Sequence, residues 1–148
     1  MDNTTTTKCR KTLYWLSTGL ASLALMAIGV SDVKHAPSVT EGLKELGYPV
    51  YFATIIGVWQ LFGVAALLIP GLPRLKEWAY AGFFFMLTGA SMSHAILGDP
   101  TGRILFPLVL LGDLAVSWAL QPARVAVVAT DAAMEQPKVS ATTKEHAY

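Results

Sequence analysis

The stretch that decides the fold is Pro49–Pro70, PVYFATIIGVWQLFGVAALLIP, inside a charge-free run from Leu46 to Pro73. The hydrocarbon core of a bilayer is about 30 Å thick, and a helix needs roughly 20 mostly apolar residues to cross it. The two prolines stand at the first turn and at the stop, where a helix tolerates them. The stretch therefore predicts a transmembrane helix.

Three more stretches have the same character. The four predicted spans are residues 12–31, 49–70, 77–97 and 104–121. No charged residue lies between Lys11 and Asp32, and Asp113 is the only charge in the fourth span. The links between the later spans are short, so neighbouring helices must run antiparallel. We therefore expect an all-α integral membrane protein, a four-helix up-down-up-down bundle over residues 12–121.

The first span has an alternative interpretation as a cleaved signal peptide. It follows basic residues, and Ala27 and Gly29 are small enough for a peptidase site. However, its apolar run is longer than a usual signal core and three more spans follow, which favours a retained helix.

The composition agrees with a membrane location. Charged residues make up 14% of the 148 residues, whereas soluble domains carry about 25%. The net charge of +1 and the lack of a long basic run give no argument for nucleic acid. The single cysteine, Cys9, excludes a disulfide within this chain.

The segments between and beyond the spans differ in character. Ser38–Glu41 matches a helix-capping pattern, and Val39, Leu43 and Leu46 follow at helical spacing. These residues predict a short amphipathic helix on the membrane surface, with an irregular loop as the alternative. We expect residues 122–148 to form a mostly disordered tail.

The basic residues predict an orientation. Those on one side of the predicted bundle are Lys8, Arg10, Lys11, Arg74, Lys76 and Arg124, and those on the other are Lys34, Lys44 and Arg103. Because cytoplasmic flanks carry the excess of Lys and Arg, both termini should be cytoplasmic, including the N-terminal segment 1–11.

Polar residues within the spans are the candidate functional site, because such side chains must face the bundle interior. At about 1.5 Å of rise per residue, Asp113, Gln60 and Thr88 all fall near the bilayer midplane. An Asp–Gln–Thr cluster there is therefore geometrically possible. His94 and Asp32 lie near the outer edge and could form a second pair.

The chemistry of these residues leaves alternatives open. Asp113 could hydrogen-bond to Gln60 or to a quinone carbonyl, or it could exchange protons. It could also simply lock two helices together, which is worth roughly 0.6–2 kcal/mol. The sequence has no metal-ligand cluster and no nucleotide-binding glycine loop, and His94 is the only histidine within a span. A haem held by two histidines at membrane depth is therefore not expected.

The chain resembles the DoxX-like family of small four-helix bacterial membrane proteins. The resemblance covers about residues 12–121. The motifs that carry it are Glu45–Pro49, Gly57–Leu61, Leu67–Gly71, Lys76–Phe83, Thr88–Ala90 and Ser93-His94. It implies a multi-pass protein of the bacterial inner membrane and supplies no catalytic residues.

Three hypotheses follow for the function. The wider DoxX group includes proteins tied to redox complexes, so the resemblance implies an accessory subunit of a membrane redox complex, with quinone as a ligand near Asp113, Gln60 and His94. The second hypothesis is a small proton-linked carrier that uses Asp113. The third is a structural bundle that binds a membrane partner or a second copy of itself.

Overall fold

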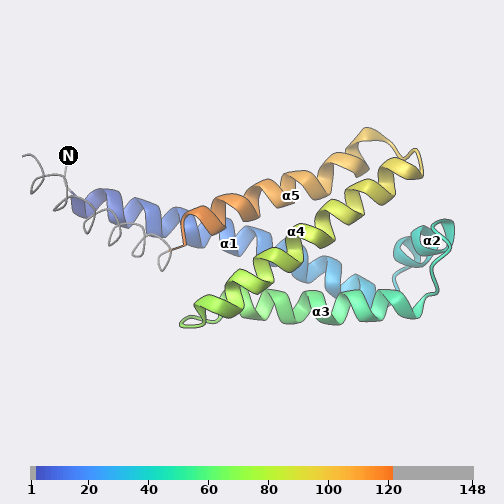
Figure 1. Ribbon diagram of the computed structural model, residues 1–148, viewed down its shortest axis with the longest axis horizontal. Coiled ribbons are helices and arrows are strands. Elements are labelled where there is room, and N and C mark those ends of the chain that lie inside the picture. Colours follow the sequence, from blue (N-terminus) through green and yellow to red (C-terminus); the bar gives the residue numbers. More distant parts are fainter. Residues whose placement is uncertain (1–2, 122–148) are drawn as a thin grey trace, which may run out of the picture.

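The computed structural model describes residues 3–121 and the side chains from residue 7 onward. This part of the chain contains five helices and no strand (Figure 1). The helices are α1 (Asn3–Val33), α2 (Pro37–Glu45), α3 (Tyr51–Leu68), α4 (Pro73–Ile96) and α5 (Thr101–Ala119). The tail predicted over residues 122–148 lies outside the described residues.

Each predicted span corresponds to one long helix. α1 begins at Asn3, well before the predicted start at Thr12, so the helix continues through the basic N-terminal segment. α4 begins at Pro73 rather than at Glu77, because a proline suits the first turn of a helix. Arg74 and Lys76 therefore belong to the first turns of α4 and not to a loop, which corrects our expectation.

Three helices are long and apolar enough to cross a membrane: α1 from Thr7, α3 and α5. α4 has 24 residues, which is about 36 Å of helix. Its charged residues Arg74, Lys76 and Glu77 all lie near its start, while the rest of the helix is mostly apolar.

The short helix predicted in the first link is present as α2. The predicted cap at Ser38 is wrong, because α2 begins two residues earlier than that cap implies, with Ala36 as the N-cap and no side-chain cap hydrogen bond. Pro37 occupies the first helical position, where its fixed φ angle already suits the helix. Ser38 is consequently inside the helix and cannot cap it.

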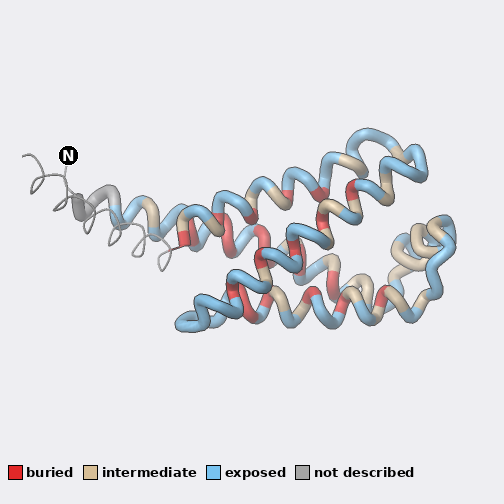
Figure 2. Tube along the Cα trace, in the orientation of Figure 1, coloured by how far each residue is buried: buried red, intermediate tan, exposed pale blue. Residues whose placement is uncertain are grey.

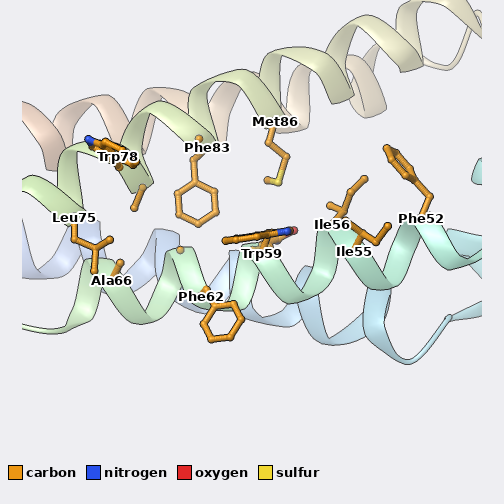
Figure 3. A pocket seen from close by; sticks show the side chains of 14 residues that line it. Phe52, Ile55, Ile56, Trp59, Phe62, Ala66, Leu75, Trp78, Phe83 and Met86 are labelled. Carbon is orange, nitrogen blue, oxygen red and sulfur yellow. The ribbon is translucent and has the colours of Figure 1, made fainter.

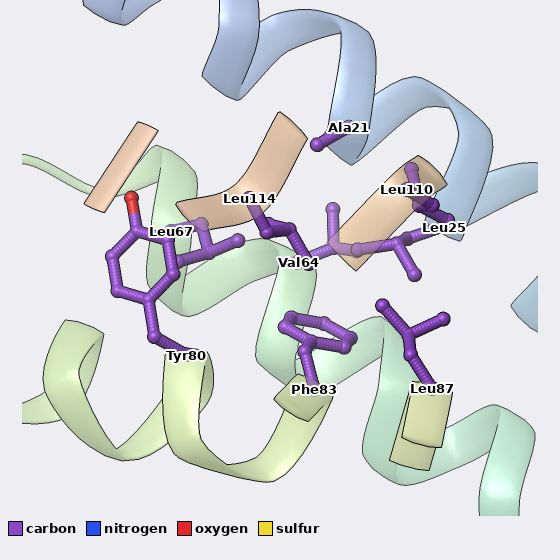
Figure 4. Close-up of a cluster of buried hydrophobic side chains, with 9 residues drawn as sticks. All are labelled: Ala21, Leu25, Val64, Leu67, Tyr80, Phe83, Leu87, Leu110 and Leu114. Atoms are coloured by element: carbon purple, nitrogen blue, oxygen red, sulfur yellow. The ribbon is translucent and has the colours of Figure 1, made fainter. Parts of the chain in front are cut away.

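The four long helices share one core. α1 packs against α3 and α5, and α4 packs against the same two helices, so α1 and α4 lie diagonally opposite. All four helices contribute to the buried apolar cluster (Figure 4). Its members are Ala21, Leu25, Val64, Leu67, Tyr80, Phe83, Leu87, Leu110 and Leu114. α2 stands at one end of the molecule beside the start of α3 (Figure 1).

The surface is strongly apolar and buried residues form an inner stripe (Figure 2). Trp78 is 79% exposed, and Trp59 and Phe85 are each 72% exposed. The residues buried inside include eight polar or charged ones, which are Ser17, Thr18, Ser22, Gln60, Lys76, Ser91, Ser117 and Gln121. A protein folded in water would hide such aromatic rings, whereas lipid favours them on the outside.

Candidate functional site

Gln60 lies in the middle of α3 and is 3% exposed. Its Nε2 donates a hydrogen bond of 2.7 Å to the backbone carbonyl of Leu25 in α1. An amide group has two N–H donors and an acceptor oxygen. This one bond therefore leaves Gln60 able to bind a further group.

Asp113 lies in α5 and faces α1. Its Oδ1 accepts a hydrogen bond from Ser17 Oγ at 2.6 Å, and the same hydroxyl is 2.8 Å from the Asp113 backbone oxygen. Its Oδ2 is buried and has no hydrogen-bond partner among the described residues. This carboxyl group therefore has one oxygen available for another interaction.

Thr88 donates its hydroxyl proton to the carbonyl of Phe84 in its own helix, at 2.7 Å. Gln60, Asp113 and Thr88 are thus hydrogen-bonded to other groups rather than to each other, and a hydrogen-bonded Asp–Gln–Thr cluster is not formed. An estimate of depth along a span does not specify the direction in which each side chain points.

The expected pair between His94 and Asp32 is wrong. His94 Nδ1 is 2.7 Å from Asp99 Oδ2, in the link that follows α4. Asp32 lies in the last turn of α1, where it is close to Gly57 of α3. The pair fails because α1 and α4 are diagonal helices, whereas Asp99 is only five residues beyond His94.

A buried chain of hydroxyl groups joins α1, α4 and α5. Thr18 donates to the Tyr14 carbonyl at 2.7 Å, so its oxygen accepts from Ser117 at 2.6 Å. Because the Ser117 hydroxyl donates its hydrogen to Thr18, its oxygen accepts a hydrogen bond from the Tyr80 hydroxyl at 2.8 Å. The Tyr14 phenol accepts from Lys76 Nζ at 3.2 Å. Buried polar contacts therefore connect α1, α4 and α5 in the half of the bundle that contains the start of α4 and the end of α5.

We did not expect this network from the sequence, although a signal was present. Tyr14, Ser17, Thr18, Ala21, Ser22 and Leu25 recur at intervals of three and four residues, and all are buried. This spacing marks one face of a helix. The face contains mainly small and polar residues, which typify helix contacts in membranes.

A groove of about 480 Å³ lies between α3 and α4 (Figure 3). Its lining is almost entirely aromatic and aliphatic, and Gln60 is the one amide-bearing residue among the described lining residues. Phe83 and Met86 point from α4 toward the Trp59 ring, whereas Phe62 points away from α4. The groove could therefore hold a flat, mostly apolar molecule that carries a hydrogen-bond acceptor.

Of the residues predicted for the site, only Gln60 lines this groove. Asp113 belongs to the contact between α1 and α5, and His94 belongs to the link between α4 and α5. The described side chains include no group of three or more His, Cys, Asp or Glu that could hold a metal ion. The groove, together with Gln60, is thus the candidate ligand site.

Comparison with known proteins agrees with the fold. Residues 16–120 match the DoxX-like family, and this range includes α1 from Leu16 through to the end of α5. No curated protein and no solved structure matches the chain. With most of its length matched and three helices apolar enough to cross a bilayer, this chain belongs to the DoxX-like family of membrane proteins.

Proposed function

We propose that this protein is an accessory subunit of a quinone-linked membrane redox complex, and that it holds the quinone in the groove between α3 and α4. The observation that carries the proposal is a groove of about 480 Å³ with aromatic walls and Gln60 among its lining residues. The resemblance to redox-associated proteins adds support.

The chemistry of a quinone suits this lining. Its ring is flat and stacks on aromatic side chains, for which Trp59 and Phe83 are available. Its carbonyl oxygens accept hydrogen bonds, and the second N–H of Gln60 can donate one. Its isoprenoid tail is apolar and would lie against the exposed outer side chains of α3. Gln60 is thereby the residue that orients the ring.

The accompanying membrane arrangement is part of the proposal. The four long helices would cross the bacterial inner membrane alternately, with both termini in the cytoplasm. The reversal of the chain at each link supports it (Figure 1), and so do the basic residues of α1 and of the first turns of α4. The hydrogen bonds that join Ser17 and Thr18 of α1 to α5 support retention of α1 in the mature protein.

The test is to purify the full chain in mild detergent, extract it, and measure bound quinone. We expect quinone in the wild type. A short-chain quinone analogue should bind Gln60→Leu about tenfold more weakly, because a buried hydrogen bond contributes roughly 1–1.5 kcal/mol. Trp59→Leu should weaken binding as well, through the lost ring contact.

The matched control is Phe106→Leu, which removes an exposed ring of α5 outside the groove. It should bind the analogue as the wild type does. Thermal unfolding of each variant checks that Gln60→Leu remains folded despite the lost bond to Leu25. Absence of quinone, together with equal analogue affinity in wild type and Gln60→Leu, would contradict the proposal.

A second function, proton-linked transport through Asp113, is favoured by one observation. The buried Oδ2 of Asp113 has no hydrogen-bond partner among the described residues. Liposomes with a trapped pH-sensitive dye would test it. Proton entry into the liposomes, reported by the dye, would favour transport if Asp113→Asn abolishes it and Gln60→Leu preserves it. A protein that is indifferent to both changes would instead be a structural partner, alone or as an oligomer.

A further inference from the structure

Lys76 is a buried cation in the first turns of α4. It is 6% exposed, and its Nζ donates to the Tyr14 hydroxyl at 3.2 Å. The ammonium group is also 5.9 Å from the ring centroids of both Tyr14 and Trp15. Among the described residues no carboxylate forms an ion pair with it. A buried lysine usually has a negatively charged partner, because burial of an unpaired charge costs free energy. A bound anion would supply that partner to Lys76.

The ammonium group has unused donors. It carries three N–H bonds, of which the Tyr14 hydroxyl accepts one. The aromatic rings attract the positive charge but accept no conventional hydrogen bond. Two donors therefore remain for a ligand.

A cavity of about 240 Å³ lies beside this lysine. Lys76, Tyr14, Trp15 and Gln121 line it, together with the α3–α4 link at residues 70–73. Gln121 is 3% exposed, and its buried Oε1 has no hydrogen-bond partner within residues 7–121. One small cavity is thus lined by both a buried cation and an unsatisfied acceptor.

The surroundings add positive charge. Lys8 and Lys11 line a shallow hollow on α1, and Trp15 borders both this hollow and the cavity. α4 begins at the cavity, and a helix N-terminus carries a partial positive charge. Among the described side chains, neither lining contains a carboxylate. The field at this end of the bundle therefore attracts an anion.

We propose that the cavity binds the phosphate headgroup of an anionic phospholipid. A phosphate oxygen accepts the free donors of Lys76, and a headgroup hydroxyl, such as that of a glycerol phosphate, donates to Gln121 Oε1. In the proposed membrane arrangement this end of the bundle lies among the headgroups, and Trp15 at the rim of the cavity is a residue type that favours that interface. The site shares no residue with the groove between α3 and α4.

Native mass spectrometry of the detergent-solubilised full chain tests this. Phosphatidylglycerol and phosphatidylcholine are titrated separately, and the bound lipid is counted. The wild type should prefer phosphatidylglycerol about fivefold or more, as one basic contact near a membrane supplies. Lys76→Gln should lose that preference. Arg74→Gln removes an equal but exposed charge from the same helix turn and should keep it.

Two further measurements keep the outcome decisive. Lys76→Arg retains the charge, so it should keep the preference even if Lys76→Gln fails to fold. Gln121→Ala should reduce the affinity for phosphatidylglycerol. The proposal is overturned if the wild type binds both lipids equally, or if Lys76→Gln and Arg74→Gln lose the preference equally. It is also overturned if millimolar inorganic phosphate displaces the lipid, because the site would then hold a free anion.

Discussion

At the residue scale, Gly57 is where α3 meets the backbone of α1. A Cβ atom added there would lie 2.7 Å from the Gly29 carbonyl oxygen and 2.9 Å from the Asp32 Cβ. The two backbones therefore approach closely at Gly57. Gly89 of α4 differs, because no neighbouring atom of the described residues lies within 4 Å of a Cβ placed there.

We expect Gly57→Ala to lower the free energy of unfolding by about 1–3 kcal/mol, because the backbones must separate to admit the methyl group. Gly89→Ala should be neutral or stabilising by up to about 1 kcal/mol, since alanine is the better helix former. Unfolding in mixed detergent–SDS micelles measures both. Equal stabilities for the two variants would show that α1 and α3 do not touch at Gly57.

Ser117 is the central member of the buried hydroxyl chain. It accepts from Tyr80 and donates to Thr18, and it is fully buried. Replacement by alanine removes the hydroxyl group that accepts the 2.8 Å hydrogen bond from Tyr80.

We expect Ser117→Ala to lower the free energy of unfolding by about 1–2 kcal/mol. The control is Ser93→Ala, because Ser93 only bonds to the Gly89 carbonyl of its own helix. That change should cost less than about 0.5 kcal/mol. The same micelle assay compares them, and a Ser117→Ala protein as stable as the wild type would contradict the network.

At the element scale, the link between α4 and α5 is held by Asp99. Its carboxylate accepts hydrogen bonds from His94 Nδ1 at 2.7 Å and from Arg103 Nη1 at 3.1 Å. One group comes from the end of α4 and the other from the start of α5. The hydrogen bond from His94, followed by the charge of Arg103, lowers the pKa of Asp99 below its ordinary value of 3.8.

This lowered pKa gives a pH dependence with a definite sign. A carboxyl group with a lower pKa in the folded protein stabilises the fold above its unfolded pKa. The contribution disappears as the pH falls below about 4 and through the folded value. The wild type should therefore lose more thermal stability between pH 6 and pH 3 than Asp99→Asn does. Identical pH profiles would mean that Asp99 does not hold the link.

At the scale of the whole molecule, the distribution of polar and apolar residues is the reverse of that in a water-soluble protein. Aromatic residues such as Trp78 and Phe85 cover the surface, whereas hydroxyl groups, Gln60 and Lys76 are inside. Apolar exteriors are stable only where the solvent is itself apolar.

The proposed topology can be tested on a Cys9→Ser background with single cysteines at exposed positions. Cysteine at Arg74, before most of α4, should react with a membrane-impermeant maleimide only from the side that carries the N-terminus. Cysteine at Thr101, after α4, should react only from the opposite side. Labelling of both from the same side would show that α4 does not cross the membrane.

Most of the helix positions could be predicted from the sequence, and the site could not. Apolar runs bounded by charges and prolines specify spans locally, which is why α3 and α5 agree with their predicted ranges within a few residues. Depth along a span is also local. The direction in which a side chain points around its helix depends on the neighbouring helices, so Thr88 bonds within α4 whereas Asp113 bonds to α1.

The sequence alone determined that the chain is helical, that lipid suits its surface, and that the DoxX-like pattern extends over its spans. These properties follow from the composition and the lengths of single segments. Only the tertiary structure decided that Lys76 is buried beside Tyr14, that His94 pairs with Asp99, and that Gln60 lines a groove. Those outcomes depend on which helices are neighbours and which are diagonal, and packing among all four helices decides that.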